Sequence, residues 1–517
     1  MSQQLILSRR RGWMATWGRM GAVAVAIVAQ LGLYVWIVLA LADSSPWVYA
    51  FSLLLSVVAV LWIVATPMPP EYKLAWVIPI LLVPVLGGAF YLLYGARRFR
   101  GKDRQRLAIA QAEATKALTA GPALQIAGGR LPTDMARQTR YLTTAGSFPV
   151  CDATKMEYFA LGDHAFPRML ADMEKAERYI LFEYFIVAAG EMWDQMFDVM
   201  RRKAAQGVDV RVLYDDLGSH FVLPRDFHKK LHEAGIKVQA VNPLGVRLRL
   251  RYNNRNHRKI LVIDGVVSYT GGINIADEYI NAIVKFGHWK DTVVRLEGPA
   301  TWSFVAMFLS VWSFVDETAD YTDFMPVGDT RQDGDWGVVQ PFDDSPFDNI
   351  PVGEEAYLGM INRARQYVDI FTPYLIIDAR MLEGLKHAAM SGIRVRIVTP
   401  HIPDKKLVFE VTRAYYHPLV EAGVEIYEYT PGFMHAKQIV VDGRSGIIGT
   451  INFDYRSFFL HQECAVWLYE SPVLKDMQDD FDATIAVSQR VTLEDCLAVP
   501  WWRHLARAIL STFAPLM

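Results

Sequence analysis

The sequence of 517 residues predicts an α/β protein of two similar halves that follow a membrane region. Three observations lead to this fold class. A short polar motif occurs twice, at residues 257–274 and 435–452. Helix-like and strand-like patterns alternate around each copy, which is typical of sheets covered by helices. Long uncharged apolar runs precede both copies, and such runs are typical of membrane-spanning helices.

The repeated motif combines four polar residues at fixed spacing. They are His257, Lys259, Asp264 and Asn274 in the first copy, and His435, Lys437, Asp442 and Asn452 in the second. The spacing from the histidine to the asparagine is identical in the two copies. One such pattern can arise by chance, but two copies with matched endings indicate a duplicated functional unit.

The motif chemistry suits phosphodiesters. The mostly apolar residues after each lysine predict a buried strand, on which His and Lys at i and i+2 point to the same face. The asparagine amide can hydrogen-bond an imidazole or a phosphate oxygen. Two facing copies would place two imidazoles and two ammonium groups around one anion. One His can then attack phosphorus while the other protonates the leaving oxygen, so we expect no metal or other cofactor.

These motifs resemble the paired HKD motifs of the phospholipase D superfamily. More narrowly, the chain resembles bacterial cardiolipin synthases over nearly its whole length, in residues 256–260, 271–279, 289–291, 296–299 and 449–458. The resemblance implies two pseudo-symmetric αβα sandwich halves that share one active site. It also implies a catalytic set of His257, Lys259, Asp264, His435, Lys437 and Asp442, with Asn274 and Asn452 binding phosphate.

Four acidic residues accompany the motifs. Asp264 and Asp442 stand at strand ends before Gly265 and Gly443, which favours a structural turn or a salt bridge over proton transfer. Asp291 follows the first histidine and Glu463 follows the second, at unequal spacings. The resemblance implies that acids so placed orient a catalytic His, and surface salt bridges are the alternative.

The resemblance also assigns His257 as nucleophile and His435 as general acid and base. Arg255 and Arg258 flank His257, and nearby cations keep an imidazole neutral. We expect Glu463 to pair with His435 and keep it protonated. His288, His401, His417 and His461 lie outside the motifs and are interpreted as ordinary residues.

The apolar runs are residues 21–42, 47–66 and 74–95. Each is about as long as the 20 residues that span a bilayer. A signal peptide or buried core helices are the alternatives. The third run contains two prolines and two consecutive glycines, which would kink it or make it re-entrant.

Basic residues define the expected orientation. A cluster between Arg97 and Arg106 follows the third run and predicts that the catalytic part is cytoplasmic. The N-terminus, with Arg9, Arg10 and Arg11, favours the same side, yet three full spans would separate the clusters. Either the third run is re-entrant or the N-terminus lies outside. We expect a multi-pass protein of the bacterial inner membrane.

Residues 101–147 predict a helical linker, followed by halves at 148–330 and 331–517. The first half predicts helix 166–179, strand 180–187, helix 192–206 and strand 208–215. The second repeats this as 357–366, 368–376, 381–391 and 393–399. The acidic segment 316–348 is the expected connection between halves.

Composition narrows the function classes. The chain is 52% hydrophobic with a net charge of −2, which gives no nucleic-acid signature. Its three cysteines match no metal spacing. Alternating Arg247, Arg249 and Arg251 form either a solvated strand face or a basic mouth for anionic lipid. The amphipathic tail 500–510 lies either on the bilayer or on the catalytic core.

The resemblance predicts transfer of a phosphatidyl group between two phosphatidylglycerols, giving cardiolipin and glycerol. The expected partners are phosphatidylglycerol and the lipid bilayer, and no nucleic acid. A hydrolytic membrane phospholipase D, or a synthase with phosphatidylethanolamine as donor, is the alternative. HKD nucleases and polyphosphate kinases have no use for apolar spans, and the complete motifs argue against a non-enzymatic scaffold.

Overall fold

The computed structural model describes residues 46–66, 68–83, 87–88, 91, 102–121, 131–243, 254–316, 319–347 and 350–516. The chain divides into two compact units, Met1–Gly95 and Ala96–Met517. The predicted run 21–42 and the alternating arginines at 247–251 lie outside the described residues.

The first unit contains two described helices, α2 (Pro46–Ala65) and α3 (Pro70–Leu82). Helix α2 coincides with the predicted run 47–66 and exposes apolar side chains, among them Trp47, Phe51 and Leu61. Helix α3 begins before the predicted third run because Pro69 and Pro70 set a helical start. None of the helices that the structure describes has both the length and the apolar character needed to cross a membrane.

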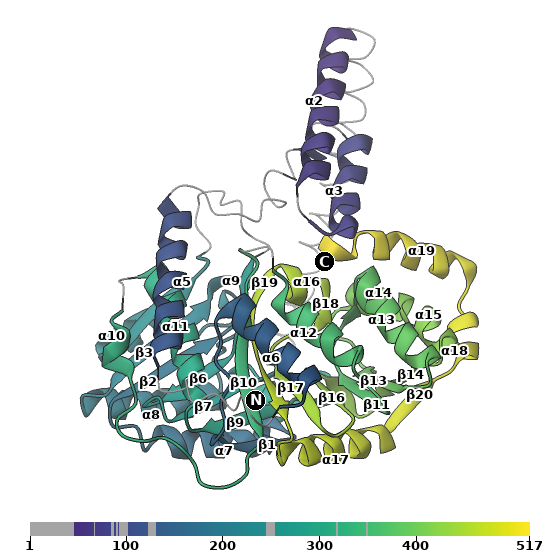
Figure 1. The fold of residues 1–517 in the computed structure, drawn as a ribbon. Coiled ribbons are helices and arrows are strands. Elements are labelled where there is room, and N and C mark those ends of the chain that lie inside the picture. Colours follow the sequence, from purple (N-terminus) through teal and green to yellow (C-terminus); the bar gives the residue numbers. More distant parts are fainter. Residues whose placement is uncertain are drawn as a thin grey trace, which may run out of the picture. The chain divides into compact units, whose positions relative to one another are not determined.

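The second unit is built on two large sheets that lie side by side (Figure 1). The first has the order β1 (Lys155–Phe159), β9 (Val293–Glu297), β7 (Val267–Gly271), β6 (Ile260–Ile263), β2 (Tyr179–Tyr184), β3 (Asp209–Asp215) and β4 (Lys237–Val241). The second has the order β10 (Val338–Asp344), β19 (His461–Tyr469), β17 (Ser445–Gly449), β16 (Gln438–Val441), β11 (Tyr367–Phe371), β13 (Arg394–Pro400), β14 (Glu425–Tyr429) and β20 (Ser488–Val491). The order is the same strand for strand except that β20 is added. The predicted duplication of an α/β fold is confirmed.

Helices flank both sheets. They are α7 (Gly162–Met173), α8 (Glu191–Ala205) and α10 (Phe227–Glu233) in the first half, and α12 (Val352–Ile361), α13 (Ala379–Met390), α15 (Tyr416–Glu421) and α17 (Val473–Ala486) in the second. The predicted ranges for α8, β3, α13 and β13 agree closely with the structure. Two predicted helices, 166–179 and 357–366, end too late, because α7 ends at Met173 and α12 at Ile361, each followed by a turn before the next strand.

Helix α11 (Thr301–Val315) joins the two halves into one body. It contacts β6 of the first sheet and β10 of the second, and most of its residues are buried. A helix that is apolar on all sides needs such surroundings, since it has no face to offer to water. The main hydrophobic core accordingly runs through both halves.

The segment before the sheets also packs on this body. Helices α5 (Lys102–Ala120) and α6 (Thr133–Gly146) fit the helical prediction for 101–147. The indole Nε1 of Trp302 on α11 donates to the Ala117 carbonyl at 2.9 Å, and α6 contacts β10 and α12. The connection between halves is shorter than predicted, because β10 already begins at Val338.

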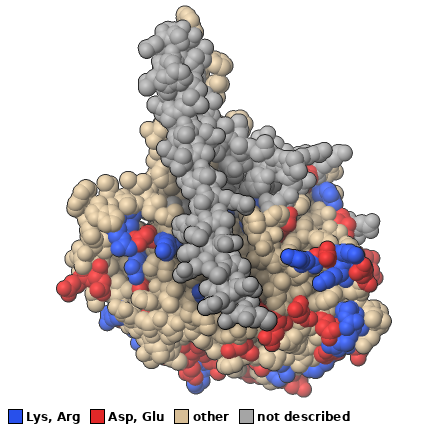
Figure 2. Space-filling model, turned by 180° about the vertical axis from the view of Figure 1, so that it is seen from behind, with Lys and Arg blue, Asp and Glu red and all other residues tan. Residues whose placement is uncertain are grey.

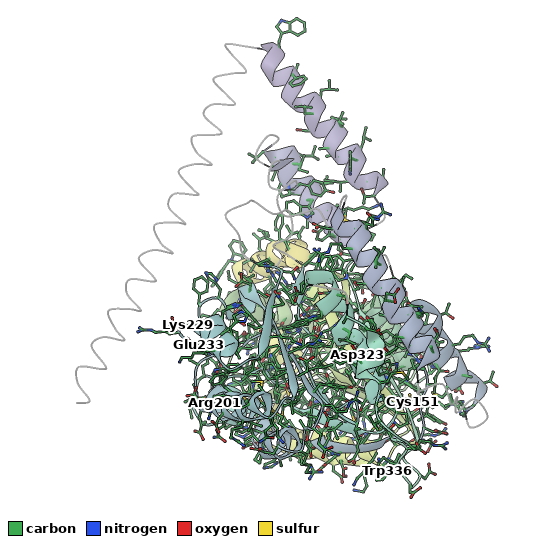
Figure 3. All side chains as sticks on the ribbon, turned by 90° about the vertical axis from the view of Figure 1, so that its left-hand side faces the viewer. Cys151, Arg201, Lys229, Glu233, Asp323 and Trp336 are labelled. Atoms are coloured by element: carbon green, nitrogen blue, oxygen red, sulfur yellow. The ribbon has the colours of Figure 1, made fainter. Side chains whose placement is uncertain are left out.

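The surface outside the site is charged with both signs. Lys and Arg lie close to Asp and Glu at the two sides and along the lower part of the face seen in Figure 2. Lys229 and Glu233 of α10 form an exposed ion pair at 3.9 Å at the edge of the body in Figure 3. Cys151, Cys464 and Cys496 are free and buried.

Candidate active site

The two motif histidines lie at equivalent places in the two sheets. His257 and Lys259 stand in the extended segment just before β6, and His435 and Lys437 just before β16. Because β6 and β16 run antiparallel to β2 and β11, these segments lie beside the C-terminal ends of β2 and β11. The predicted strands after each lysine are confirmed, although the His and Lys themselves precede them.

Each histidine backbone is held by the other half. Strand β5 (Arg255–Asn256) pairs in parallel with β19 of the second sheet, and His257 N donates to the Gln462 carbonyl at 2.9 Å.

The second histidine repeats this arrangement with the roles of the halves exchanged. Strand β15 (Gly432–Met434) pairs in parallel with β8 (His288–Lys290) of the first half. His435 N donates to the Lys290 carbonyl at 2.7 Å. The residue after Gln462 is Glu463, and the residue after Lys290 is Asp291, so each exchange brings an acid to a histidine.

The two His–acid pairs therefore cross between the halves. His257 Nδ1 lies 2.9 Å from both carboxylate oxygens of Glu463, and His435 Nδ1 lies 2.6 Å from Asp291 Oδ2. Both carboxylates are fully buried. An acid at Nδ1 fixes the tautomer and the ring orientation, which leaves Nε2 for the substrate.

The predicted orienting role of Asp291 and Glu463 fits this geometry, but the expected partner of Glu463 is wrong. Glu463 contacts His257 and not His435, because the strand that carries it pairs with β5. The unequal spacings of the two acids arise after the asparagines, since the segment from Asn274 to Asp291 is longer than the segment from Asn452 to Glu463.

Both lysines are buried beside their histidines. Lys259 Nζ donates to the His257 carbonyl at 2.7 Å, and Lys437 Nζ donates to the His435 carbonyl. Lys437 Nζ also lies 2.8 Å from His435 Nδ1, farther than the Asp291 carboxylate. Burial lowers the pKa of Lys259 to about 8 and that of Lys437 to about 7. Such desolvated cations favour an anion between them.

Burial also holds the imidazoles toward their neutral forms. It lowers the pKa of His257 well below the ordinary histidine value, and the charges of Lys259 and His461 lower it further. The pKa of His435 is lowered to about 4, first by burial and then by Lys437, while Asp291 acts in the opposite direction. Burial has the opposite effect on the acid that contacts His257, because it disfavours the charged carboxylate and raises the pKa of Glu463 to about 8.

The arginines next to His257 do not supply the positive charge expected of them. Arg255 lies 3.7 Å from the carboxylate of Asp215, and Arg258 pairs with Asp343 of the second half. Their charges are thus compensated locally, and Lys259 takes the role predicted for them.

The asparagines are buried and anchor loops. Asn274 donates from Nδ2 to the Tyr279 hydroxyl at 2.7 Å and accepts from the Ile186 N–H at 3.1 Å. Asn452 donates from Nδ2 to Asp454 Oδ2 at 2.9 Å. Phosphate binding by these amides stays a prediction.

Asp264 and Asp442 lie at the far ends of β6 and β16 from the histidines. Asp264 accepts the backbone N–H groups of residues 177–179 at 2.8–2.9 Å, and Asp442 accepts those of residues 365–367 at the same distances. A whole short strand separates each aspartate from its lysine, a span of about 16 Å along the chain. This geometry fits the turn role that their place before glycine predicts, and a catalytic role of either aspartate stays a prediction.

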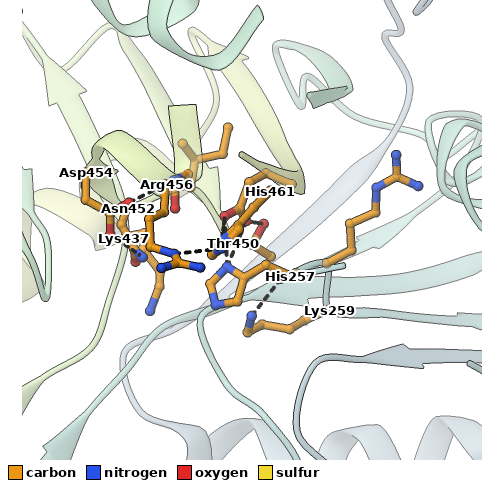
Figure 4. Close-up of polar contacts among 12 residues, drawn as sticks. His257, Lys259, Lys437, Thr450, Asn452, Asp454, Arg456 and His461 are labelled. Carbon is orange, nitrogen blue, oxygen red and sulfur yellow. Dashed lines mark hydrogen bonds and ion pairs between the residues drawn. The ribbon is translucent and has the colours of Figure 1, made fainter. Parts of the chain in front are cut away.

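His461 belongs to the site, so its interpretation as an ordinary residue is wrong (Figure 4). Its ring centroid lies 5.5 Å from that of His257, and its Nδ1 lies 3.6 Å from Glu463 Oε1. Arg456 Nε lies 3.3 Å from His461 Nε2. A usable signal was present in the sequence: His461 and Glu463 stand at positions i and i+2, so on one strand they share a face.

The two acids also differ in the residue that stands beside them. The hydroxyl of Thr450 donates to Glu463. The equivalent position in the first half is Gly272, where an added Cβ would lie 1.8 Å from Asp291 Oδ1. The position beside the Asp291 carboxylate therefore requires glycine, whereas the Glu463 carboxylate accepts a hydrogen bond from a threonine hydroxyl.

Aromatic rings enclose both imidazoles. The ring of Phe185 packs edge-on against His257 with centroids 5.0 Å apart. Tyr279, Trp289 and Phe433 surround His435 at 5.4, 5.5 and 5.7 Å. These walls account for the desolvation, and a water-poor site strengthens every charge interaction within it.

One group of donors could hold a metal ion among the described residues. The donor atoms of His257, His461 and Glu463 all lie within 4.8 Å of one another. Two of these residues already contact each other in the His257–Glu463 pair.

The duplicated sheets, the strand pairs between the halves and the two acid-paired histidines fit the phospholipase D class of enzymes, which a family match shows. A family model described as cardiolipin synthase, PLD-like domain, matches residues 169–285 and 357–485, one stretch in each half. A second, described as phospholipase D-nuclease N-terminal, matches residues 54–95.

The chain belongs to the bacterial cardiolipin synthase family. It is 34% identical over 457 residues to the major cardiolipin synthase ClsA of Bacillus subtilis, covering 86% of this chain and 93% of that one. It is 35% identical to the cardiolipin synthase of Geobacillus kaustophilus, covering 87% and 89%. The solved phosphatidylserine synthase of Haemophilus influenzae shares the fold with a TM-score of 0.54 at 13% identity, covering 74% of this chain and 98% of that one.

Proposed function

We propose that the protein transfers a phosphatidyl group from one phosphatidylglycerol to another and releases glycerol. The observation that carries this proposal is the pair of acid-oriented histidines, His257 with Glu463 and His435 with Asp291, in a buried cationic site. The relatives named as cardiolipin synthases match almost the whole chain and support this choice of lipid.

In the first step, Nε2 of His257 attacks the phosphorus of the donor lipid. The bond between phosphorus and the glycerol oxygen breaks, and protonated His435 gives its proton to that oxygen. A phosphatidyl-histidine and free glycerol result.

In the second step, neutral His435 removes the proton from the hydroxyl of a second phosphatidylglycerol. The oxygen attacks phosphorus, the bond to His257 breaks, and cardiolipin leaves. The protons balance over the cycle, because His435 recovers the one that it donated.

The electrostatic surroundings support these roles. Burial and then the charge of Lys259 hold His257 neutral, as a nucleophile requires, and Glu463 is itself driven toward its neutral form by burial. At His435 the Asp291 carboxylate favours the protonated ring. A bound phosphodiester anion would raise the pKa of His435 and of both lysines, so that His435 is protonated when it has to donate its proton.

Lys259 and Lys437 stabilise the negative charge that develops on the phosphorane oxygens. The aromatic walls around the histidines exclude water, which favours transfer to a lipid hydroxyl over hydrolysis. Asn274 and Asn452 each retain an amide N–H beyond the one described above, and we assign it to a phosphate oxygen.

We further propose that the first unit anchors the enzyme in the bacterial inner membrane through the runs 21–42, 47–66 and 74–95. The exposed apolar side chains of α2 support this assignment, since water is a poor solvent for them. The basic cluster from Arg97 to Arg106 favours a cytoplasmic catalytic part.

The test supplies the full-length protein with phosphatidylglycerol labelled separately in the head-group glycerol and in the acyl chains. We expect labelled cardiolipin and free glycerol in equal amounts, with turnover unchanged by EDTA. Phosphatidic acid as the main product would replace this proposal with a hydrolytic phospholipase. Cardiolipin formed only when phosphatidylethanolamine is added would identify a different donor, and loss of activity in EDTA restored by one divalent metal would contradict the metal-free mechanism.

A further inference from the structure

Helix α19 (Trp501–Thr512) is amphipathic, but it turns its basic side toward the protein and its apolar side outward. Its basic side chains face the protein: Arg503 Nε lies 3.1 Å and Arg507 Nε 3.0 Å from Glu410 Oε2, on α14 (Lys406–Ala414). Its apolar side chains face outward, with Trp501 77%, Trp502 59%, Leu505 54% and Ile509 54% exposed. An aqueous surface favours the opposite orientation.

The ion pairs fix this orientation. Arg507 is buried, and Leu510 packs with Ile376, Val411 and Ala514 beneath the helix. The outward row therefore cannot turn inward without breaking both contacts to Glu410. An exposed apolar row held in place in this way marks a surface that meets an apolar medium.

Positive charge accompanies the apolar row. Lys405 and Lys406 are exposed where α14 begins, next to exposed Leu407. Helices α14 and α19 pack on each other, so these lysines belong to the same part of the surface. Basic and tryptophan side chains beside an apolar face are complementary to anionic phospholipid head groups.

This surface lies at the active-site edge of the second sheet (Figure 1). Helix α14 follows the C-terminal end of β13, which is parallel to β11 and ends at the same edge as His435. The short helix η4 (Ala514–Leu516) continues α19 and packs against α16 (Tyr455–Phe459), which carries Arg456. The surface is thus mechanically connected to the His461 side of the site.

The first half exposes apolar residues at the corresponding edge. Phe221 is 89% exposed in the segment after β3, the equivalent of β13, and Val222 beside it is exposed as well. Apolar side chains therefore flank the active-site edge on both halves.

We propose that the outer face of α19, with Lys405, Lys406 and Leu407, docks the catalytic unit onto an anionic phospholipid bilayer. Trp501, Trp502, Leu505 and Ile509 enter the interfacial region, and the lysines meet head-group phosphates. This holds the active-site edge at the bilayer, so that both lipid substrates reach the histidines without crossing water. The inference rests on the proposed function for its lipid substrates.

The first test measures bilayer contact independently of turnover. An environment-sensitive fluorophore is attached to Leu505→Cys in the full-length protein, reconstituted in vesicles of phosphatidylglycerol and phosphatidylcholine. The three native cysteines are buried, which favours selective labelling. The matched control is Met390→Cys, because Met390 is 76% exposed at the end of α13 that precedes β13, on the opposite edge of the sheet.

We expect the emission of the label at position 505 to shift to shorter wavelength and to be quenched by lipids brominated in their acyl chains. The label at position 390 should keep the emission of a fluorophore in water and should not be quenched. An aqueous signal at both positions overturns the proposal. A shielded label at 505 that brominated lipid does not quench also overturns it, since a second copy or another protein then covers α19.

The second test changes the surface. Leu505→Asp with Ile509→Asp should lower cardiolipin formation from phosphatidylglycerol in vesicles by about tenfold, with a much smaller loss on short-chain phosphatidylglycerol in micelles. Met390→Asp should lower neither. An equal loss in vesicles and micelles contradicts the docking role. If the protein forms no cardiolipin at all, the proposed function fails while the quenching result still decides the surface.

Discussion

The two halves of the catalytic unit have the same framework and different electrostatic surroundings. The strand order of the first sheet recurs in the second, and Asp264 and Asp442 make the same three backbone hydrogen bonds. The acids that contact the histidines differ: an aspartate beside glycine contacts His435, and a glutamate beside threonine contacts His257.

In the proposed mechanism, it is the neighbouring residues, and not the motif residues, that divide the chemistry between two similar histidines. Each His–Lys motif is incomplete because its orienting acid comes from the opposite half. The duplication therefore persists as one composite site, in which the surroundings of each imidazole can diverge without loss of the shared framework.

The largest expected effect comes from removing either imidazole. His257→Ala and His435→Ala should each lower cardiolipin formation by at least about 10³-fold, because neither half retains a complete site. The measurement is product formation per folded protein, with His387→Ala on the exposed side of α13 as the control. Turnover near the wild-type rate in either variant would mean that one half works alone.

The crossed acids come next. Asp291→Asn and Glu463→Gln should each lower turnover on phosphatidylglycerol by about 10²–10⁴-fold, since the wrong tautomer of the paired imidazole is then favoured. A donor with p-nitrophenol as leaving group separates them, because such a group departs without an acid.

With that donor, Asp291→Asn and His435→Ala should keep a rapid burst of p-nitrophenol, whereas Glu463→Gln and His257→Ala should lose it. A burst lost in the Asp291 variant and retained in the Glu463 variant would show that the acids serve the opposite steps.

The glycine and threonine beside the acids allow a finer comparison. Gly272→Ala places a Cβ 1.8 Å from Asp291 Oδ1 and must displace the carboxylate from His435, so turnover should fall by about 10²-fold. Thr450→Ala removes the hydroxyl that donates to Glu463 and accepts the Cys464 N–H, and it should cost about tenfold or less. Steady-state rates on phosphatidylglycerol decide, and equal losses in both variants would contradict the steric difference between the halves.

The smallest effect on chemistry is expected at the turn aspartates. Asp264→Asn and Asp442→Asn should each lower the free energy of unfolding by about 1–3 kcal/mol, since a half-buried acceptor of three N–H groups loses its charge. Turnover of the folded protein should stay the same, as it should in the exposed control Asp476→Asn. Reduced turnover at unchanged thermal stability would show that these aspartates take part in catalysis.

The sequence predicted the features that repeat or have a period. The two motifs, the buried strands after each lysine and most αβ boundaries follow from spacing and alternation. The partner of Glu463 did not follow, because the pairing of β5 with β19 joins segments from opposite halves of the chain, and spacing within one half carries no information about it.

The sequence also could not show that the charge of an arginine beside His257 is compensated by a distant residue. Arg258 next to His257 was expected to lower its pKa, yet Asp343 of the other half neutralises that charge. His461 was passed over because it lies outside the motif, although its i, i+2 relation to Glu463 on one strand was readable. The apolar helix α11 gave no periodic signal, since it is buried on all sides between the halves.

The central claim is that His257 carries the covalent intermediate and His435 moves the protons. The direct measurement is mass spectrometry of the full-length protein quenched during turnover of phosphatidylglycerol, followed by digestion and mapping of the phosphatidyl adduct. The account places the adduct on the peptide that contains His257, with greater accumulation in Asp291→Asn, where transfer to the acceptor is slowed. An adduct on the His435 peptide would contradict this division of roles, and its absence from both peptides during active turnover would contradict the covalent mechanism itself.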